Sequence, residues 1–147
     1  MFIEYTEQGF DKVLKAMDKM PRSMRNKALR PALRKGAQVV RARAAANVKQ
    51  VATQGYATGL LSRSIVVRQM RTRNGVLRVA VTIAPQKVSR KGVRVGLYGS
   101  VLEHGKSDQR PAPWLRPAAK QSQGQAYSVI KAEASRNLVI SIEDAKR

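Results

Sequence analysis

Apolar residues near the start of the chain recur at the spacing of an amphipathic helix. We therefore expect a short helix from about residue 8 to residue 20 that ends at Pro21. The residues of its apolar stripe are Phe10, Val13, Leu14, Met17 and Met20.

A second, longer helical pattern covers Met24 to Val51, with an apolar stripe made of Leu29, Leu33, Gly36 or Ala37, Val40, Ala44, Val48 and Val51. Pro31 interrupts this pattern, because a proline inside a helix removes a hydrogen bond and costs roughly 3 kcal/mol. We expect either a kink near Lys27 to Pro31 or a helix that starts afresh there. The small residues Ala42 and Ala44 to Ala46 either allow close packing against a sheet or a neighbouring subunit, or simply favour a helix.

The middle of the chain carries the pattern of a β-hairpin. Residues Ser64 to Met70 are rich in β-branched side chains, and Asn74-Gly75 is a pair typical of a type I′ turn. Beyond this pair, large apolar side chains alternate with others, and the large ones are Leu77, Val79, Val81 and Ile83. The sequence predicts strands at about 63 to 73 and 76 to 84.

Two further elements complete the predicted fold. The alternation of Val93, Val95 and Leu97 indicates a third strand, after Pro85 and a basic loop. Beyond Pro117, a helical stripe is formed by Tyr127, Ile130, Ala134, Leu138 and Ile142. This order predicts an α+β fold in which a small antiparallel sheet with a β-hairpin is packed by two N-terminal helices and one C-terminal helix. With 147 residues, we expect a single domain over residues 1–147.

The segment from Tyr98 to Ala118 combines aromatic residues with three prolines, and we expect it to be a loop outside the hydrophobic core. Its prolines predict a rigid stretch from Arg110 to Arg116, because each proline fixes its own φ and restricts the residue before it. Trp114 either packs in the core or anchors in a partner's pocket. Glu103 is either a solvated surface acid or an acceptor of hydrogen bonds from Arg110, Arg116 or the loop backbone.

Three parts of the sequence together resemble the neck or tail-completion family of long-tailed bacteriophages, whose members lie at the head–tail joint. Thr58-Gly59-Leu60-Leu61-Ser62-Arg63-Ser64-Ile65 is similar to the family's T-G-x-L-x-x-S-I element, and Met20-Pro21 is similar to its L-P. The third part contains Tyr98, Glu103, His104, Gly105, Pro113, Trp114, Leu115, Arg116 and Pro117. His104 and Trp114 depart from the family pattern, which has an aromatic residue and a phenylalanine there.

The resemblance implies a structural role in the virion. It implies a ring subunit of the neck, with a hexamer favoured, that joins the head connector to the tail terminator or tail tube proteins and surrounds the DNA channel. The residues of the motif, from Thr58, Gly59 and Leu60 onward, would then shape the fold or the subunit interface. The protein would be made in the host cytoplasm and reside in the virion.

The net charge of +20 is concentrated in the middle of the chain, since no carboxylate occurs between Asp18 and Glu103. Such a surplus predicts a polyanionic neighbour, either packaged DNA or an acidic protein, although a solvated basic face is the simpler alternative. The residues expected to face the polyanion are Arg63, Arg68, Arg71, Arg73, Arg78, Lys87, Arg90, Lys91 and Arg94. A free, non-enzymatic nucleic-acid-binding protein also fits the charge, but the chain lacks the signatures of the common nucleic-acid-binding modules.

Residues suited to catalysis are scarce. The chain has one histidine and no cysteine, so a zinc site is not expected, and Glu103 and His104 are adjacent, which directs their side chains apart. No phosphate-binding or dinucleotide-binding glycine motif is present. We expect a protein that is not an enzyme and that uses no cofactor. No apolar run is long enough to span a bilayer, and a membrane-surface protein, a third hypothesis, would need a basic helix with a bulky aromatic face, which the sequence lacks. No membrane partner is therefore expected.

Overall fold

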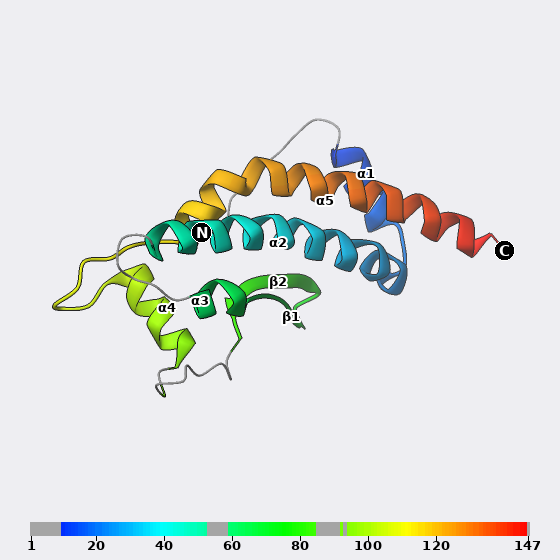
Figure 1. The fold of residues 1–147 in the computed structure, drawn as a ribbon. Coiled ribbons are helices and arrows are strands. Elements are labelled where there is room, and N and C mark those ends of the chain that lie inside the picture. The colour runs from blue at the N-terminus through cyan, green and yellow to red at the C-terminus, as the bar shows by residue number, and fades with distance from the viewer. Residues whose placement is uncertain (1–9, 53–58, 85–91, 93, 147) are drawn as a thin grey trace.

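The computed structural model describes residues 10–52, 59–84, 92 and 94–146. Two long helices, α2 (Arg22–Ala52) and α5 (Leu115–Ala145), lie side by side over most of their length (Figure 1). On the other side of α2 lie a β-hairpin and the short helix α3 (Gly59–Ser64) (Figure 1). The fold is therefore α+β, as the sequence predicts, and α2 is its central layer.

Helix α1 (Phe10–Asp18) packs against both long helices near one end of the molecule. Its Met17 is buried in a cluster with Ala28 and Ala32 of α2 and with Ala134 and Leu138 of α5. The small side chains on α2 allow the helices to approach closely, and Gly36 lies directly against Ile130 and the backbone of α5. The small residues that face α5 are therefore Ala28, Ala32 and Gly36, whereas of those named from the sequence only Ala44 is buried, in the cluster that contains Leu61 and Ile65.

Helix α2 continues through Pro31. The expectation of a helix that starts afresh at Pro31 is therefore wrong. Pro31 is exposed, whereas Ala28 and Ala32 beside it are buried. Tertiary contacts of these neighbours with α1 and α5 hold this part of the chain helical, which offsets the local cost of the proline.

The hairpin consists of β1 (Ile65–Arg73) and β2 (Val76–Ile83), paired antiparallel with Ile65 opposite Ile83 and Arg73 opposite Val76. Asn74 and Gly75 between them have φ angles of 53° and 75°, which confirms the predicted tight turn. Near the base of the hairpin, Arg41 of α2 donates a hydrogen bond from Nε to the Ile65 carbonyl oxygen at 2.7 Å. This contact ties the first strand to the central helix.

The predicted third strand is wrong, because the chain forms helix α4 (Val95–His104) there. Val95, Gly99 and Leu102 are buried, with the spacing of one helical face, whereas Leu97 is 65% exposed. Three alternating apolar residues are too few to distinguish the two-residue period of a strand from the 3.6-residue period of a helix. This segment is helical because it buries Val95 and Leu102 against Leu61, Ile65 and α2. Val93 and the basic loop before it lie outside the described residues.

The segment from Tyr98 to Ala118 is also not a single loop. Its first part belongs to α4, and its last part belongs to α5, which begins at Leu115. Pro117 is the third residue of α5, where a proline is tolerated because the first N–H groups of a helix have no partner within it. Only the residues between the two helices form a connection, and this connection holds Trp114 in the core. At the far end of α5, Ile142 is exposed although the sequence placed it on the buried stripe.

Candidate functional site

The corner between α4 and α5 is organised by one carboxylate. Glu103, near the end of α4, has only 6% of its surface exposed. Its Oε2 accepts hydrogen bonds from the backbone N–H groups of Trp114 and Leu115, both at 2.8 Å, and its Oε1 accepts one from the backbone N–H of Arg116 at 3.0 Å. Glu103 thus caps the N-terminus of α5 from another helix, a place where negative charge is favourable.

The electrostatic state of Glu103 follows from these contacts. Burial by itself would raise the pKa of the Glu103 carboxyl, but the N–H groups of Leu115, Trp114 and Arg116 and the nearby Arg116 guanidinium outweigh it, so the pKa lies below its ordinary value. The guanidinium Nε of Arg116 lies 3.7 Å from Oε1. Glu103 is therefore not a solvated surface acid, and it accepts backbone hydrogen bonds as the other interpretation of the sequence held, from Trp114 at the end of the connection and from the first two residues of α5.

Trp114 is a core residue, with 2% of its surface exposed. Its indole Nε1 donates a hydrogen bond to the Gly99 carbonyl oxygen at 3.0 Å, and its own carbonyl oxygen accepts one from Asn47 Nδ2 of α2 at 3.1 Å. The side chain packs with Leu61, Leu102 and their neighbours. Of the two alternatives for Trp114, the structure supports packing in the core over an anchor in a partner's pocket.

The other motif residues surround this corner or the start of α3. Gly59 begins α3, and Leu60 and Tyr98 pack against the core. Gly105 follows α4 with a φ of 78°, and a Cβ there would crowd Pro111. Pro113 is exposed and Leu115 partly buried, whereas Thr58 lies outside the described residues. His104 is exposed while Glu103 is buried, so the two side chains diverge on α4, as their adjacency predicts.

The cationic residues named from the sequence occupy several surfaces. Arg68, Arg71, Arg73 and Arg78 are exposed on the hairpin, and Arg94 is exposed before α4. Arg63 is exposed on α3, with its Nε bonded to the Gly59 carbonyl oxygen at 3.0 Å. Lys87, Arg90 and Lys91 lie outside the described residues. The structure therefore places four of the predicted cations together, on both strands of the hairpin.

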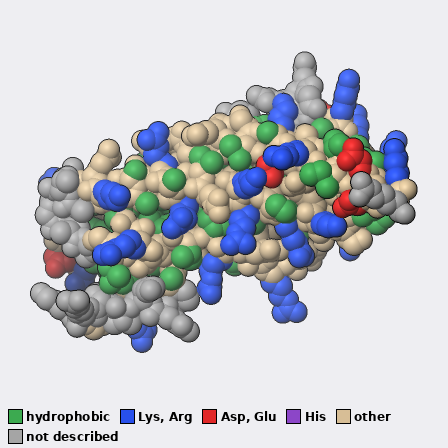
Figure 2. Space-filling view, turned by 45° about the vertical axis from the view of Figure 1, so that its right-hand side comes forward, with side chains coloured by type: hydrophobic (Ala, Val, Ile, Leu, Met, Phe, Trp, Pro, Cys, Tyr) green, Lys and Arg blue, Asp and Glu red, His purple; other side chains and the backbone are tan. Residues whose placement is uncertain are grey.

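Sequence reasoning left the cations of α2 out of this set. Helix α2 carries Lys and Arg along its whole length and no Asp or Glu. Figure 2 shows Lys and Arg side chains scattered over one entire face of the molecule, with few acidic ones. The absence of carboxylates from α2 in the sequence was the signal for this surface.

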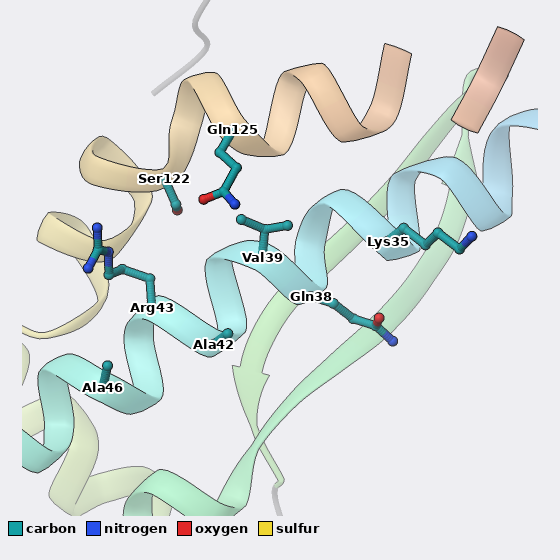
Figure 3. Close-up of a pocket in the computed structure, with 8 residues that line it drawn as sticks. All are labelled: Lys35, Gln38, Val39, Ala42, Arg43, Ala46, Ser122 and Gln125. Atoms are coloured by element: carbon teal, nitrogen blue, oxygen red, sulfur yellow. The ribbon is translucent and has the colours of Figure 1, made fainter. Parts of the chain in front are cut away.

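Among the hollows of the described residues, two lie along the first half of α5. A shallow groove of about 730 Å³ runs between α2 and α5, where Val39 and Ala42 face Ser122 and Gln125, with Arg43 near one end (Figure 3). A second pocket, of about 780 Å³, lies at the N-terminus of α5 and is lined mainly by apolar side chains. Its apolar lining residues are Pro111, Pro113, Leu115, Pro117 and Ala119, and its polar lining residues are Glu103, His104, Arg116, Lys120 and Gln121.

The described part of the chain offers neither a metal centre nor a membrane span. Within it, no three acidic, histidine or cysteine side chains cluster as a metal site would require. None of the helices described here has both the length and the apolar character needed to cross a membrane.

Comparison with known proteins identifies the family. The family model described as "Bacteriophage HK97-gp10, putative tail-component" matches residues 11–105, more than half of the chain. No curated protein and no solved structure matches the chain. The matched residues run from α1 to the end of α4 and include the Thr58 to Ile65 element and Glu103. The chain therefore belongs to the HK97-gp10-like family of bacteriophage tail components, which are structural proteins of the virion.

Proposed function

We propose that this tail component acts at the neck of the phage, as one domain that is the repeating subunit of a ring. In this proposal the ring joins the head connector to the tail terminator or tail tube proteins and surrounds the channel through which DNA passes. Six subunits are favoured by the resemblance of the sequence to neck proteins. The observation that carries the proposal is the exposure of apolar side chains at separate places on a strongly cationic chain of this family.

A ring built by head-to-tail contact needs two different surfaces on each subunit. Among the described residues, large apolar side chains are exposed on the last turns of α5, at Val139, Ile140 and Ile142, and on the hairpin, at Met70 and Val76. Leu97 of α4 is exposed as well. These surfaces lie on different elements, which suits contacts with different neighbours.

The exposed arginines of the hairpin are the evidence for the proposed DNA channel. Arg68, Arg71, Arg73 and Arg78 lie on a hairpin that has no Asp or Glu, so no acid of the hairpin offsets their charge. Guanidinium groups bind phosphate without reading the base sequence, as a channel for moving DNA requires. Lys87, Arg90 and Lys91 remain part of the proposed polyanion-facing surface on sequence grounds alone.

The first experiment is imaging of the purified full-length protein by electron microscopy, in which we expect closed rings. A monomer that binds DNA at physiological salt would instead favour a free nucleic-acid-binding protein, the alternative that the charge also fits. In the phage, deletion of the protein should leave heads and tails that fail to join. Normal, infectious virions after complete deletion would refute the neck role.

A second experiment tests the channel surface. Replacement of Arg68, Arg71 and Arg78 by Gln should leave the melting temperature nearly unchanged, because exposed charges contribute little to stability. It should reduce the slope of log affinity for DNA against log salt by about 0.9 for each phosphate that the variant no longer neutralises. The matched control replaces Lys12, Lys15 and Arg136, three exposed cations of α1 and α5, by Gln. Equal slopes for the two variants would show that the hairpin is not part of the DNA-facing surface.

A further inference from the structure

The pocket at the N-terminus of α5 presents an apolar lining to solvent. It is formed by the end of α4, the proline-rich connection and the first turns of α5. Pro113 and Ala119 are exposed there, and Leu115 and Pro117 are only partly buried. The bonds of Glu103 to the backbone fix the connection, so the pocket is preformed and needs little ordering to bind a partner.

The charges around this pocket select the kind of partner. Arg116 and Lys120 are exposed cations of its lining, and their spacing of four residues places them on the same face of α5. Glu103 is the acid among the lining residues, but both of its carboxylate oxygens already accept backbone hydrogen bonds. Although Glu103 also lies 3.7 Å from Arg116 Nε, 68% of the Arg116 side chain is exposed. The pocket therefore suits a surface that presents apolar side chains with carboxylates beside them.

The last turns of α5 present such a surface. Val139, Ile140 and Ile142 have 55%, 47% and 40% of their surface exposed. Glu143 lies one turn beyond Val139, Asp144 lies one turn beyond Ile140, and both acids are exposed. Figure 2 shows acidic side chains beside hydrophobic ones at the end of the molecule where α5 ends. These five residues are called the distal patch below, and their chemistry is complementary to that of the pocket.

The charges at the two ends of α5 are opposite to those that its own dipole favours. Acids stabilise the first turn of a helix and bases stabilise the last turn. The first turn of α5 has no acid and carries Arg116, whereas its last turn has no base and carries Glu143 and Asp144. A base, Lys146, follows only at the C-cap, and Asp144 makes a surface ion pair at 3.9 Å with Lys27, which contributes little. The stability of α5 therefore does not account for these charges, whereas pairing of its two ends between copies does.

The distal patch cannot reach the pocket of its own chain. Both surfaces lie on α5, a single helix of 31 residues. Lys120 and Glu143 are about 35 Å apart along this helix, at 1.5 Å per residue. A contact between the two surfaces therefore joins two copies, and each copy can use its pocket towards one neighbour and its distal patch towards another. Such a contact is head-to-tail, because the two surfaces differ.

We propose that the pocket at the N-terminus of α5 binds the distal patch of a second copy of the chain. The apolar side chains of the patch pack against the prolines of the pocket, and the two carboxylates of the patch lie near Arg116 and Lys120. The inference rests on the proposed ring, because a contact of this kind repeats from one subunit to the next. It assigns the two ends of α5 as the two halves of one subunit contact.

Cross-linking between introduced cysteines tests this contact directly, because the chain has no cysteine of its own. One full-length chain carries Gln121→Cys, at an exposed residue that lines the pocket, and the other carries Lys146→Cys, at an exposed residue beside the distal patch. When the two chains are mixed and treated with a short bismaleimide, we expect a covalent heterodimer. The matched control replaces Gln121→Cys by Ala132→Cys, at an exposed residue of α5 that belongs to neither surface. No heterodimer, or an equal yield from the control mixture, would overturn the proposal.

Charge reversal tests the electrostatic part of the contact in the same two chains. Lys120→Glu in the Gln121→Cys chain, or Glu143→Lys in the Lys146→Cys chain, should raise the protein concentration for half-maximal cross-linking by about tenfold or more, and by less as salt is added. Both reversals together should restore cross-linking, because the two charges are again opposite. The control pairs Glu143→Lys with Arg34→Glu, at an exposed cation of α2, which gives the same net charge and should restore nothing. No restoration by Lys120→Glu, or equal restoration by Arg34→Glu, would refute the contact.

Melting curves and imaging separate this inference from misfolding and from the ring itself. At concentrations where the chain is monomeric, Glu143→Lys should melt no lower than the parent, because a base suits the last turn of a helix. Rings of the parent together with the heterodimer support both proposals. Rings without the heterodimer refute the contact and leave the ring. The heterodimer with open filaments in place of rings supports the contact and refutes the ring, and the absence of both refutes both.

Discussion

Replacement of Glu103 by Gln tests the link between the corner and the stability of the whole fold. A glutamine has nearly the same shape but one acceptor oxygen in place of two. In the parent, Trp114 and Leu115 donate to Oε2 and Arg116 donates to Oε1, so either orientation of the amide leaves at least one N–H group facing an NH2 group. The substitution also removes the negative charge at the start of α5.

The expected loss is set by one or two hydrogen bonds to a charged group. At about 1.5 to 3 kcal/mol each, and with some relaxation of the loop, we expect the free energy of unfolding to fall by about 3 kcal/mol. For a chain of this size, that corresponds to a melting temperature lower by roughly 6 to 12 °C. The control is Glu143→Gln, an exposed carboxylate near the end of α5, which should change the free energy of unfolding by less than about 0.5 kcal/mol.

The pH dependence gives the same prediction a second readout. Because the pKa of Glu103 is lower in the folded protein than its ordinary value, the ionised carboxylate contributes its full stabilisation above about pH 4.3, the usual pKa of a glutamate. This stabilisation is lost as the pH falls through the lower pKa of the folded state. The difference between parent and Glu103→Gln should therefore shrink in acid. A Glu103→Gln protein that melts with the parent at pH 7, or a difference that grows in acid, would refute the role given to this carboxylate.

Three further substitutions test the packing of the fold, each by thermal or denaturant unfolding. Gly36→Ala should lower the free energy of unfolding by about 1 to 3 kcal/mol, because its Cβ would overlap Ile130. Its control, Gly124→Ala on the open side of α5, should raise the free energy of unfolding slightly. Equal effects of the two substitutions would contradict the close contact of α2 with α5. Gly75→Val should cost on the order of 1 to 3 kcal/mol, because Gly75 has a φ of 75°, and an unchanged midpoint would remove the turn assignment. Trp114→Ala should lower the free energy of unfolding by about 3 to 5 kcal/mol, because the core would pack less well. A fully stable variant that fails to assemble would show instead that Trp114 contacts a partner at the surface of the subunit.

Local patterns predicted the parts of the fold that depend on local rules. The turn at Asn74-Gly75 was predictable because few residues accept positive φ angles in succession. The stripe of α2 was predictable because one long helix repeats the same spacing many times. The segment around Val95 and Leu97 was not, because a few alternating residues fit a strand as well as a helix, and only contacts with distant residues decide.

In the candidate site, too, local patterns predicted some features, and contacts with distant residues decided the others. The sequence predicted that Glu103 could bind the loop backbone, but it left open whether Trp114 packs inside or outside, because burial depends on where α2 passes. The pocket at the start of α5 could not be read from the sequence either. It exists only because the end of α4 is brought beside residues that follow it by a proline-rich turn.

The short connection between α4 and α5 also has a consequence for the order in which the chain folds. Glu103 and Trp114 are 11 residues apart, whereas the contact between Lys35 and Glu133, which joins α2 to α5, spans 98 residues. By the logarithmic dependence of loop-closure entropy on length, the longer loop costs about 2 kcal/mol more to close. The hydrogen bonds of Glu103 to the start of α5 can therefore form while α2 and α5 are still apart, and they then give α5 a fixed starting direction. A nucleus at this corner would let the long-range pairing of the two helices proceed by docking preformed structure.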